Sequence, residues 1–132
     1  MSHLLDTNAC IALINGRPTT VRERLRLSLK RGDRVWLSSV AVFELWYGVA
    51  KSENTERLAV FTAPFEVLSF DAEDARRAGT VRAALERAGS PIGAYDVLIA
   101  GQALRHALVL VTANIGEFGR VAHLRWEDWS IA

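Results

Sequence analysis

Short apolar runs alternate with longer segments of helical periodicity along this chain. Residues 3–6 predict a strand that ends at Asp6, and the run "LVLVT" at 108–112 is typical of a strand buried on both faces. Further strands are expected at 34–38 and 65–70, with a last edge strand in the tail "LRWEDWS". Between the strands, the pattern predicts helices at 8–15, 19–31, 39–51, 54–61, 72–88 and 92–106.

This alternation of strands and helices determines the expected fold class. It predicts an α/β protein, a single domain over residues 1–132, in which helices cover both faces of a mainly parallel central sheet. Ligands of such folds bind beyond the carboxyl ends of the strands. Asp6 and Thr112 each end a predicted strand, so we expect both to face the same crevice.

The composition restricts the class of protein and the cellular environment to be expected. The chain has 132 residues, of which 50% are hydrophobic and 23% charged, so it can bury a core and remain well hydrated. It contains neither a membrane-spanning apolar run nor a secretory signal pattern. Cys10 is the only cysteine, which excludes an internal disulfide. We expect Cys10 in the core and the protein in the cytoplasm.

The net charge of +1 does not by itself indicate a nucleic-acid partner, but basic residues are concentrated in one segment. Residues 17–34 hold seven arginines and lysines against two acids, a local excess of five. Such a segment can meet phosphates, or it can be an ordinary solvated helix face. Both readings remain open from the sequence.

Three acids in apolar surroundings are the candidate chemistry. Asp6 follows a strand, Glu44 lies in "AVFELWYGVA", and Asp96 lies in "GAYDVLIAG". Each also has a structural reading. Asp6 can cap the following helix, Glu44 can be a partly exposed surface residue, and Asp96 can cap its own helix, although Ser90 before Pro91 is the better start signal. Buried carboxylates that cluster repel one another and need a cation, and oxygen ligands without paired His or Cys favour Mg²⁺ or Mn²⁺.

The segment "VTANIGEF" at 111–118 adds polar groups directly after a strand. The hydroxyl of Thr112 and the amide of Asn114 are candidates to orient a reacting water, and Glu117 is a further acid nearby. An ordinary turn built from Thr, Asn and Gly is the alternative.

These motifs together resemble a known family. "LLDTN", "SSVAVFELWYG", "GAYDVLIAGQAL" and "LVTANIGEF" occur in the order and approximate spacing of PIN-domain ribonucleases, and the match is closest to VapC toxins of bacterial toxin–antitoxin pairs. The resemblance runs from residue 3 to about residue 129. The closing "LRWEDW" is similar to the VapC branch that cuts initiator tRNA.

The resemblance implies a fold, a reaction and partners. It implies a PIN-like domain in which Asp6 and Asp96 are the principal Mg²⁺ ligands and Glu44 completes the site, with Mn²⁺ as a substitute. Asn114 stands where the family often has Asp. The implied reaction is hydrolysis of a phosphodiester in structured RNA, at a tRNA anticodon loop, with initiator tRNA favoured. The implied partner is a VapB antitoxin that contacts operator DNA itself, in a homodimer or hetero-oligomer.

Other readings of the residues are weaker. A dehalogenase-type phosphoaspartate enzyme needs a second Asp where Asn8 stands, and a receiver domain needs a late lysine, whereas the only lysines are Lys30 and Lys51. A catalytically inactive module that binds RNA or protein remains the alternative. No two histidines have metal-ligand spacing, so we expect structural roles for His3, His106 and His123. The four tryptophans are expected to pack in the core or against a partner rather than to stack on bases.

Overall fold

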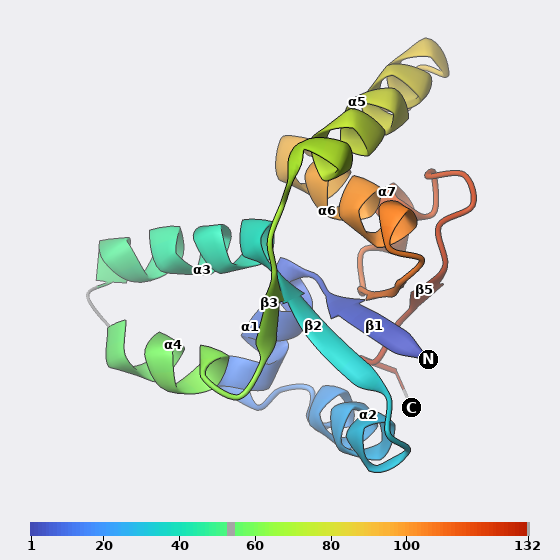
Figure 1. Cartoon of the computed structure of the whole chain (residues 1–132). Coiled ribbons are helices and arrows are strands. Elements are labelled where there is room, and N and C mark those ends of the chain that lie inside the picture. Colours follow the sequence, from blue (N-terminus) through green and yellow to red (C-terminus); the bar gives the residue numbers. More distant parts are fainter. Residues whose placement is uncertain (53–54, 132) are drawn as a thin grey trace.

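A five-stranded, wholly parallel sheet forms the centre of the molecule (Figure 1). The computed structural model describes residues 1–52 and 55–131. The strands lie in the order β3-β2-β1-β4-β5, so β1 is central. Their bounds are Ser2–Leu5 (β1), Arg34–Ser38 (β2), Glu66–Leu68 (β3), Val109–Val111 (β4) and Trp126–Glu127 (β5). The predicted α/β class and parallel sheet are confirmed, although β3 and β5 are shorter than the segments 65–70 and 124–130 in which they were predicted.

The predicted helices lie within a few residues of their expected positions, and a further short helix lies in the segment 111–118, where no helix was predicted. They are α1 (Thr7–Asn15), α2 (Thr19–Lys30), α3 (Ser39–Ser52), α4 (Thr55–Thr62), α5 (Ala72–Arg87), α6 (Ala94–Arg105) and the short α7 (Ile115–Phe118). Residue 54, the predicted start of α4, lies outside the described residues. The expectation that Ser90 starts the sixth helix is wrong, because α6 begins at Ala94 after Gly93. Within the described part of the chain, no helix combines the length and apolarity needed to cross a membrane.

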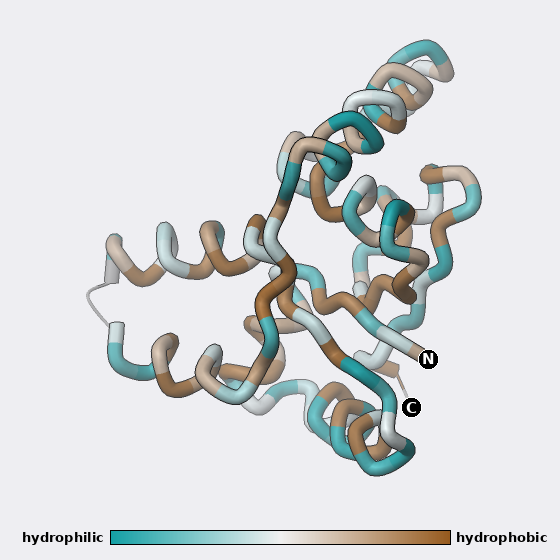
Figure 2. The backbone as a smooth tube through the Cα atoms, viewed as in Figure 1, coloured by the Kyte–Doolittle hydropathy of each residue, from teal (hydrophilic) through white to brown (hydrophobic). Residues whose placement is uncertain are grey.

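Helices cover both faces of the sheet, as expected. Successive strand residues point to opposite faces, so Leu4 packs into a core with α5 and α6, whereas Leu5 packs into a second core with α1 and α2. Cys10 is fully buried in the second core, which confirms its predicted place. Along the helices hydrophobic and hydrophilic positions alternate (Figure 2), as burial on one side requires.

Helix α6 lies unusually close to α5. A Cβ atom added at Gly101 would stand 2.6 Å from Cα and 2.7 Å from the backbone nitrogen of Ala78. Only glycine allows this approach. Because α6 also carries Asp96 near its start, the contact between the two helices fixes where that carboxyl group lies.

The other end of α6 is tied to the start of α5. Asp71 and Asp74 form a reciprocal capping box, in which each side chain accepts a hydrogen bond from the other's backbone N–H. Asp74 is fully buried, and Oδ1 also accepts from Arg105 at 3.0 Å and lies 3.1 Å from His106 Nε2. The structure shows a polar link that anchors both helices, and it gives His106 a structural contact.

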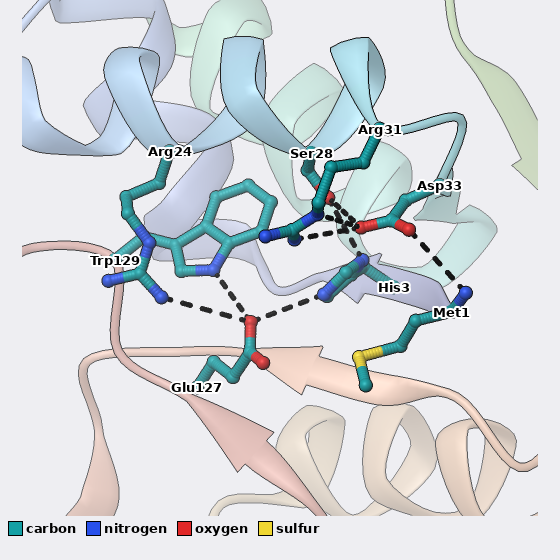
Figure 3. Close-up of polar contacts among 8 residues, drawn as sticks. All are labelled: Met1, His3, Arg24, Ser28, Arg31, Asp33, Glu127 and Trp129. Carbon is teal, nitrogen blue, oxygen red and sulfur yellow. Dashed lines mark hydrogen bonds and ion pairs between the residues drawn. The ribbon is translucent and has the colours of Figure 1, made fainter.

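A second polar cluster joins β1, α2 and the end of the chain (Figure 3). His3 is fully buried, with Nε2 3.2 Å from Glu127 Oε1 and Nδ1 3.4 Å from the hydroxyl of Ser28. That hydroxyl donates to Asp33 at 2.7 Å, and Trp129 donates its indole N–H to Glu127 at 3.0 Å. Burial lowers the pKa of His3, although Glu127 opposes the shift. His3 is therefore a structural histidine, as expected, and Trp129 belongs to the core.

Candidate active site

Asp6 stands at the carboxyl end of the central strand and has two partners that fix its side chain. Its Oδ1 accepts a hydrogen bond from the backbone N–H of Ala9 at 2.8 Å, so it caps α1. The hydroxyl of Thr112, at the end of the neighbouring strand β4, donates to the same carboxylate. Asp6 is only 3% exposed. The capping reading of Asp6 is therefore correct, and it does not exclude a place in a site, because the carboxylate also faces other acids.

Glu44 reaches the same region from α3. Thr7, directly after Asp6, donates its hydroxyl hydrogen to Glu44 Oε1 at 2.7 Å. The aromatic neighbours that made Glu44 look confined in sequence lie largely in solvent: Phe43 is 51% exposed and Tyr47 is 60% exposed. The reading of Glu44 as a partly exposed residue is therefore correct, although its helical neighbours Val40 and Ala41 are buried. Its half-buried carboxylate is held by Thr7 near the carboxyl end of the sheet.

Asp96 lies in the first turn of α6, where the positive end of the helix dipole favours a negative charge. It does not cap the helix, because Gly93 holds the cap position and no side chain bonds there. The capping reading of Asp96 is therefore wrong. Its carboxyl group instead shares a hydrogen bond with Glu117.

Glu117 is the residue whose role was least visible in the sequence. Its Oε2 accepts from the side-chain amide of Asn114 at 2.7 Å, and its Oε1 accepts from the backbone N–H of Gly93 at 3.1 Å. The backbone N–H of Asn114 in turn donates to Thr112 at 2.9 Å. Thr112 and Asn114 thus hold Asp6 and Glu117 respectively. The spacing of three residues between Asn114 and Glu117 on one helical turn was the available signal.

The electrostatics show that these acids act on one another. Burial raises the pKa of Asp6, and the charges of Glu44 and Asp128 raise it further, while hydrogen bonds from Thr112 and Ala9 oppose the shift. Burial and the hydrogen bond to Glu117 raise the pKa of Asp96 to about 7, and the charges of Asp6 and Glu44 add to this. The hydrogen bond from Asp96 lowers the pKa of Glu117. The region therefore favours a proton or a cation.

The oxygen atoms of the side chains that converge here are the kind of ligand that a hard divalent cation prefers. Every side chain that converges here offers oxygen, and neither cysteine nor histidine takes part. In residues 1–52 and 55–131, no three acids, histidines or cysteines are already close enough to hold one ion together. Thr7 holds the side chain of Glu44, and Asn114 holds that of Glu117. The carboxylates already lie near the carboxyl end of the sheet, but they must rotate to bind one shared ion.

The basic segment 17–34 forms α2 and the start of β2. Arg31 pairs with Asp33 at 2.9 Å, and Arg34 pairs with Glu66 at 2.6 Å and lies over the ring of Trp36. The positive charge available to a phosphate is therefore smaller than the sequence count indicates.

Comparison with known proteins shows which family this chain belongs to. The PIN domain model matches residues 3–124. The chain is 45% identical to the tRNA(fMet)-specific endonuclease VapC of Shigella flexneri, over 98% of this chain and 99% of that protein. The chain belongs to the PIN-domain family of VapC ribonucleases.

Solved VapC structures share the fold. The crystal structure of VapBC2 from Rickettsia felis, bound to a DNA fragment from its promoter, aligns with a TM-score of 0.90 at 36% identity, covering 98% of this chain and 99% of that one. The DNA-bound VapBC of Salmonella typhimurium aligns with a TM-score of 0.88 at 42% identity, covering 98% of each chain. The expected PIN-like architecture is thereby confirmed.

Proposed function

We propose that this VapC-family chain is a metal-dependent endoribonuclease toxin that hydrolyses a phosphodiester bond in a tRNA anticodon loop, with initiator tRNA as the favoured substrate. The observation that carries the reaction is the convergence of Asp6, Glu44, Asp96 and Glu117 at one end of the sheet, close enough to perturb one another. The substrate rests on the 45% identity to a protein named as a tRNA(fMet)-specific endonuclease.

Asp6 and Asp96 are assigned as the principal ligands of Mg²⁺, with Mn²⁺ as a substitute, and Glu44 completes the set. When bound, such a cation supplies positive charge that offsets the phosphate and makes a nearby water more acidic. Thr7 orients Glu44, and Thr112 holds Asp6 beside α1. These contacts hold the acids near the same end of the sheet, and their carboxylates would rotate toward a shared cation when it binds.

The reaction proceeds by in-line attack of water on phosphorus. The bond from phosphorus to the 3′ oxygen breaks, so the products carry a 5′-phosphate and a 3′-hydroxyl. The carboxylates, with Asn114 and Thr112 at their side, give the water its hydrogen-bonding partners. Attack by the RNA's own 2′-hydroxyl would instead leave a cyclic phosphate, which makes the end groups diagnostic.

The partner is inferred to be a VapB-type antitoxin. The Rickettsia and Salmonella relatives are VapBC complexes bound to DNA. By this analogy the protein acts in the cytoplasm as a homodimer or hetero-oligomer, and meets operator DNA only through the antitoxin. Helix α3 offers an exposed apolar surface for that contact, with Phe43, Trp46 and Tyr47 exposed by 51%, 40% and 60%.

The interface assignment has a direct probe. Trp46→Glu places a charge on the exposed surface of α3 and should weaken capture by the antitoxin without loss of folding. Phe61 is a poorer probe, because it is partly buried and its ring lies 5.3 Å from that of Phe65. Unchanged affinity of folded Trp46→Glu for the antitoxin would remove α3 from the interface.

The proposed substrate and cofactor are tested together. Antitoxin-free protein is incubated with initiator tRNA and with an elongator tRNA, each with Mg²⁺, Mn²⁺, Ca²⁺ or EDTA. We expect one cut in initiator tRNA with Mg²⁺ or Mn²⁺ and none with EDTA. Equal cutting of both tRNAs would contradict the substrate, and cutting in EDTA would contradict the cofactor.

A further inference from the structure

A cavity of about 180 Å³ lies directly beside the acidic site. It is bounded by α1, the start of α2, the end of β4 and residues 128–130, and we call it the Thr112 cavity. Its lining includes Ala9, Ala12, Val21, Thr112, Asp128 and Trp129. Neither the acids nor the reaction described above makes use of it.

The Thr112 cavity and the acidic site share a wall. Thr112 lines the cavity and donates its hydroxyl hydrogen to Asp6, and Ala9 lines the cavity and donates its backbone N–H to the same carboxylate. Asp128 is near enough for its charge to act on Asp6. A group bound in the cavity therefore lies immediately next to a phosphate held at the acids.

Size and charge restrict what can enter. The volume is several times the roughly 30 Å³ share of one water and below the roughly 300 Å³ of small drug-sized sites, so it fits one ring system. The walls are mainly apolar, and Ala9, Ala12, Val21 and Trp129 contribute to them. Asp128 makes the cavity unsuited to a phosphate. A flat, neutral group that donates hydrogen bonds at its edge is complementary to both features.

The walls are also rigid. Trp129 is 2% exposed, and its indole N–H donates to Glu127, whose carboxylate lies beside His3 (Figure 3). Asp128 Oδ1 accepts from both the backbone N–H and the hydroxyl of Ser130, at 2.9 and 2.5 Å. In the described part of the chain, no hydrogen bond to the other oxygen, Oδ2, is found, which leaves that atom available to a ligand.

We propose that the Thr112 cavity binds one nucleobase of the RNA substrate, next to the scissile phosphate, and that Asp128 selects a base with an amino group. Adenine, cytosine and guanine carry such a group, whereas uracil has only carbonyl oxygens and one ring N–H. A base in an RNA loop is free to leave its stack and enter such a pocket. The inference rests on the proposed ribonuclease function and adds a specificity determinant to it.

The first test fills the cavity. Ala12→Leu adds a larger side chain to the lining from the middle of α1, and Ala75→Leu makes the same change at an exposed position of α5 as the matched control. Thermal unfolding first verifies that both variants fold. Cleavage is then measured on the wild-type RNA loop and on loops in which each nucleotide near the cut is replaced, one at a time, by an abasic nucleotide.

For wild-type protein we expect one abasic position to slow cleavage by roughly tenfold to a hundredfold, the scale of one lost base contact. Ala12→Leu should lose a similar factor on the intact loop and nothing more on that abasic loop, while Ala75→Leu behaves as wild type. Folded Ala12→Leu that cuts the intact loop at the wild-type rate would overturn the proposal. If it cuts normally but binds the antitoxin less tightly, the cavity belongs to a protein side chain instead.

The second test concerns Asp128. At the position found above, uracil should be cut more slowly than the amino-bearing bases by wild-type protein, and Asp128→Asn should reduce that difference, because an amide donates as well as accepts. An unchanged ratio between bases would overturn the selecting role of Asp128. Failure of wild-type, metal-loaded protein to cut any RNA would contradict the ribonuclease function itself, which separates the two claims.

Discussion

The close contact between α5 and α6 allows a stability prediction with a built-in control. In Gly101→Ala, the new Cβ would lie 2.6–2.7 Å from backbone atoms of Ala78, a distance that real Cβ atoms essentially never show. Backbone atoms cannot rotate away, so the helices must separate. We take the cost at the upper end of the usual overpacking range, about 3 kcal/mol, offset by about 1 kcal/mol of improved helix propensity.

The net destabilisation is then about 2 kcal/mol. With an unfolding entropy of roughly 2.1 cal/mol/K per residue over 132 residues, this lowers Tm by about 7 °C. Gly79→Ala is the control, because Gly79 lies in the same helix pair, is exposed, and has no atom within 4 Å of an added Cβ. It should gain about 1 kcal/mol and raise Tm by about 3–4 °C.

Thermal unfolding followed by far-ultraviolet circular dichroism measures both variants under one condition. The reasoning requires shifts of opposite sign from the same chemical change. A Tm for Gly101→Ala equal to or above that of wild type would refute the close packing of α6 on α5.

Three further predictions concern the site and the polar links. Gly93→Ala brings a Cβ to 3.2 Å from Asp96 Oδ2, so we expect kcat/KM for RNA cleavage to fall by about tenfold with Tm unchanged, and an unaltered rate would show that this crowding is harmless. Glu117→Gln weakens the hydrogen bond to Asp96 and should cost about 10- to 100-fold in cleavage or in Mg²⁺ affinity, measured by metal titration. Hydrogen bonds from Arg105 lower the pKa of Asp71 from 3.8 to about 2. The contribution of Asp71 to stability is therefore present above pH 3.8 and is lost as the pH falls through 2. Urea unfolding should show that Asp71→Asn is less stable than wild type at pH 7, and that the difference closes at low pH.

The sequence predicted most of the fold because local pattern and topology agree. Strand residues such as Leu4 and Leu5 are apolar on both faces, and a parallel sheet with helices on each side is the arrangement that buries both. Helix ends were predicted well where a side chain or glycine marks them, as Asp6 and Gly16 do for α1. The start of α6 was missed because its cap, Gly93, carries no side-chain signal.

The candidate site was found in part, for a physical reason. Asp6 and Thr112 follow adjacent parallel strands, so topology alone brings them together. The place of Glu117 depends on how the turn after β4 approaches Gly93, a contact 24 residues apart that no local pattern encodes. Glu44 was singled out for its apolar sequence neighbours, but Phe43 and Tyr47 are more than half exposed, and the carboxylate is held by Thr7.

The central claim is that the acids at the end of the sheet hydrolyse RNA with a metal ion. Its most direct test is incubation of total cellular RNA with antitoxin-free protein, in Mg²⁺ or EDTA, beside folded Asp6→Asn, followed by mapping of the ends. The account predicts one discrete cut in a single tRNA, with 5′-phosphate and 3′-hydroxyl ends, absent in EDTA and in the variant. The same cut by Asp6→Asn, or a cyclic phosphate at the cut, would contradict it.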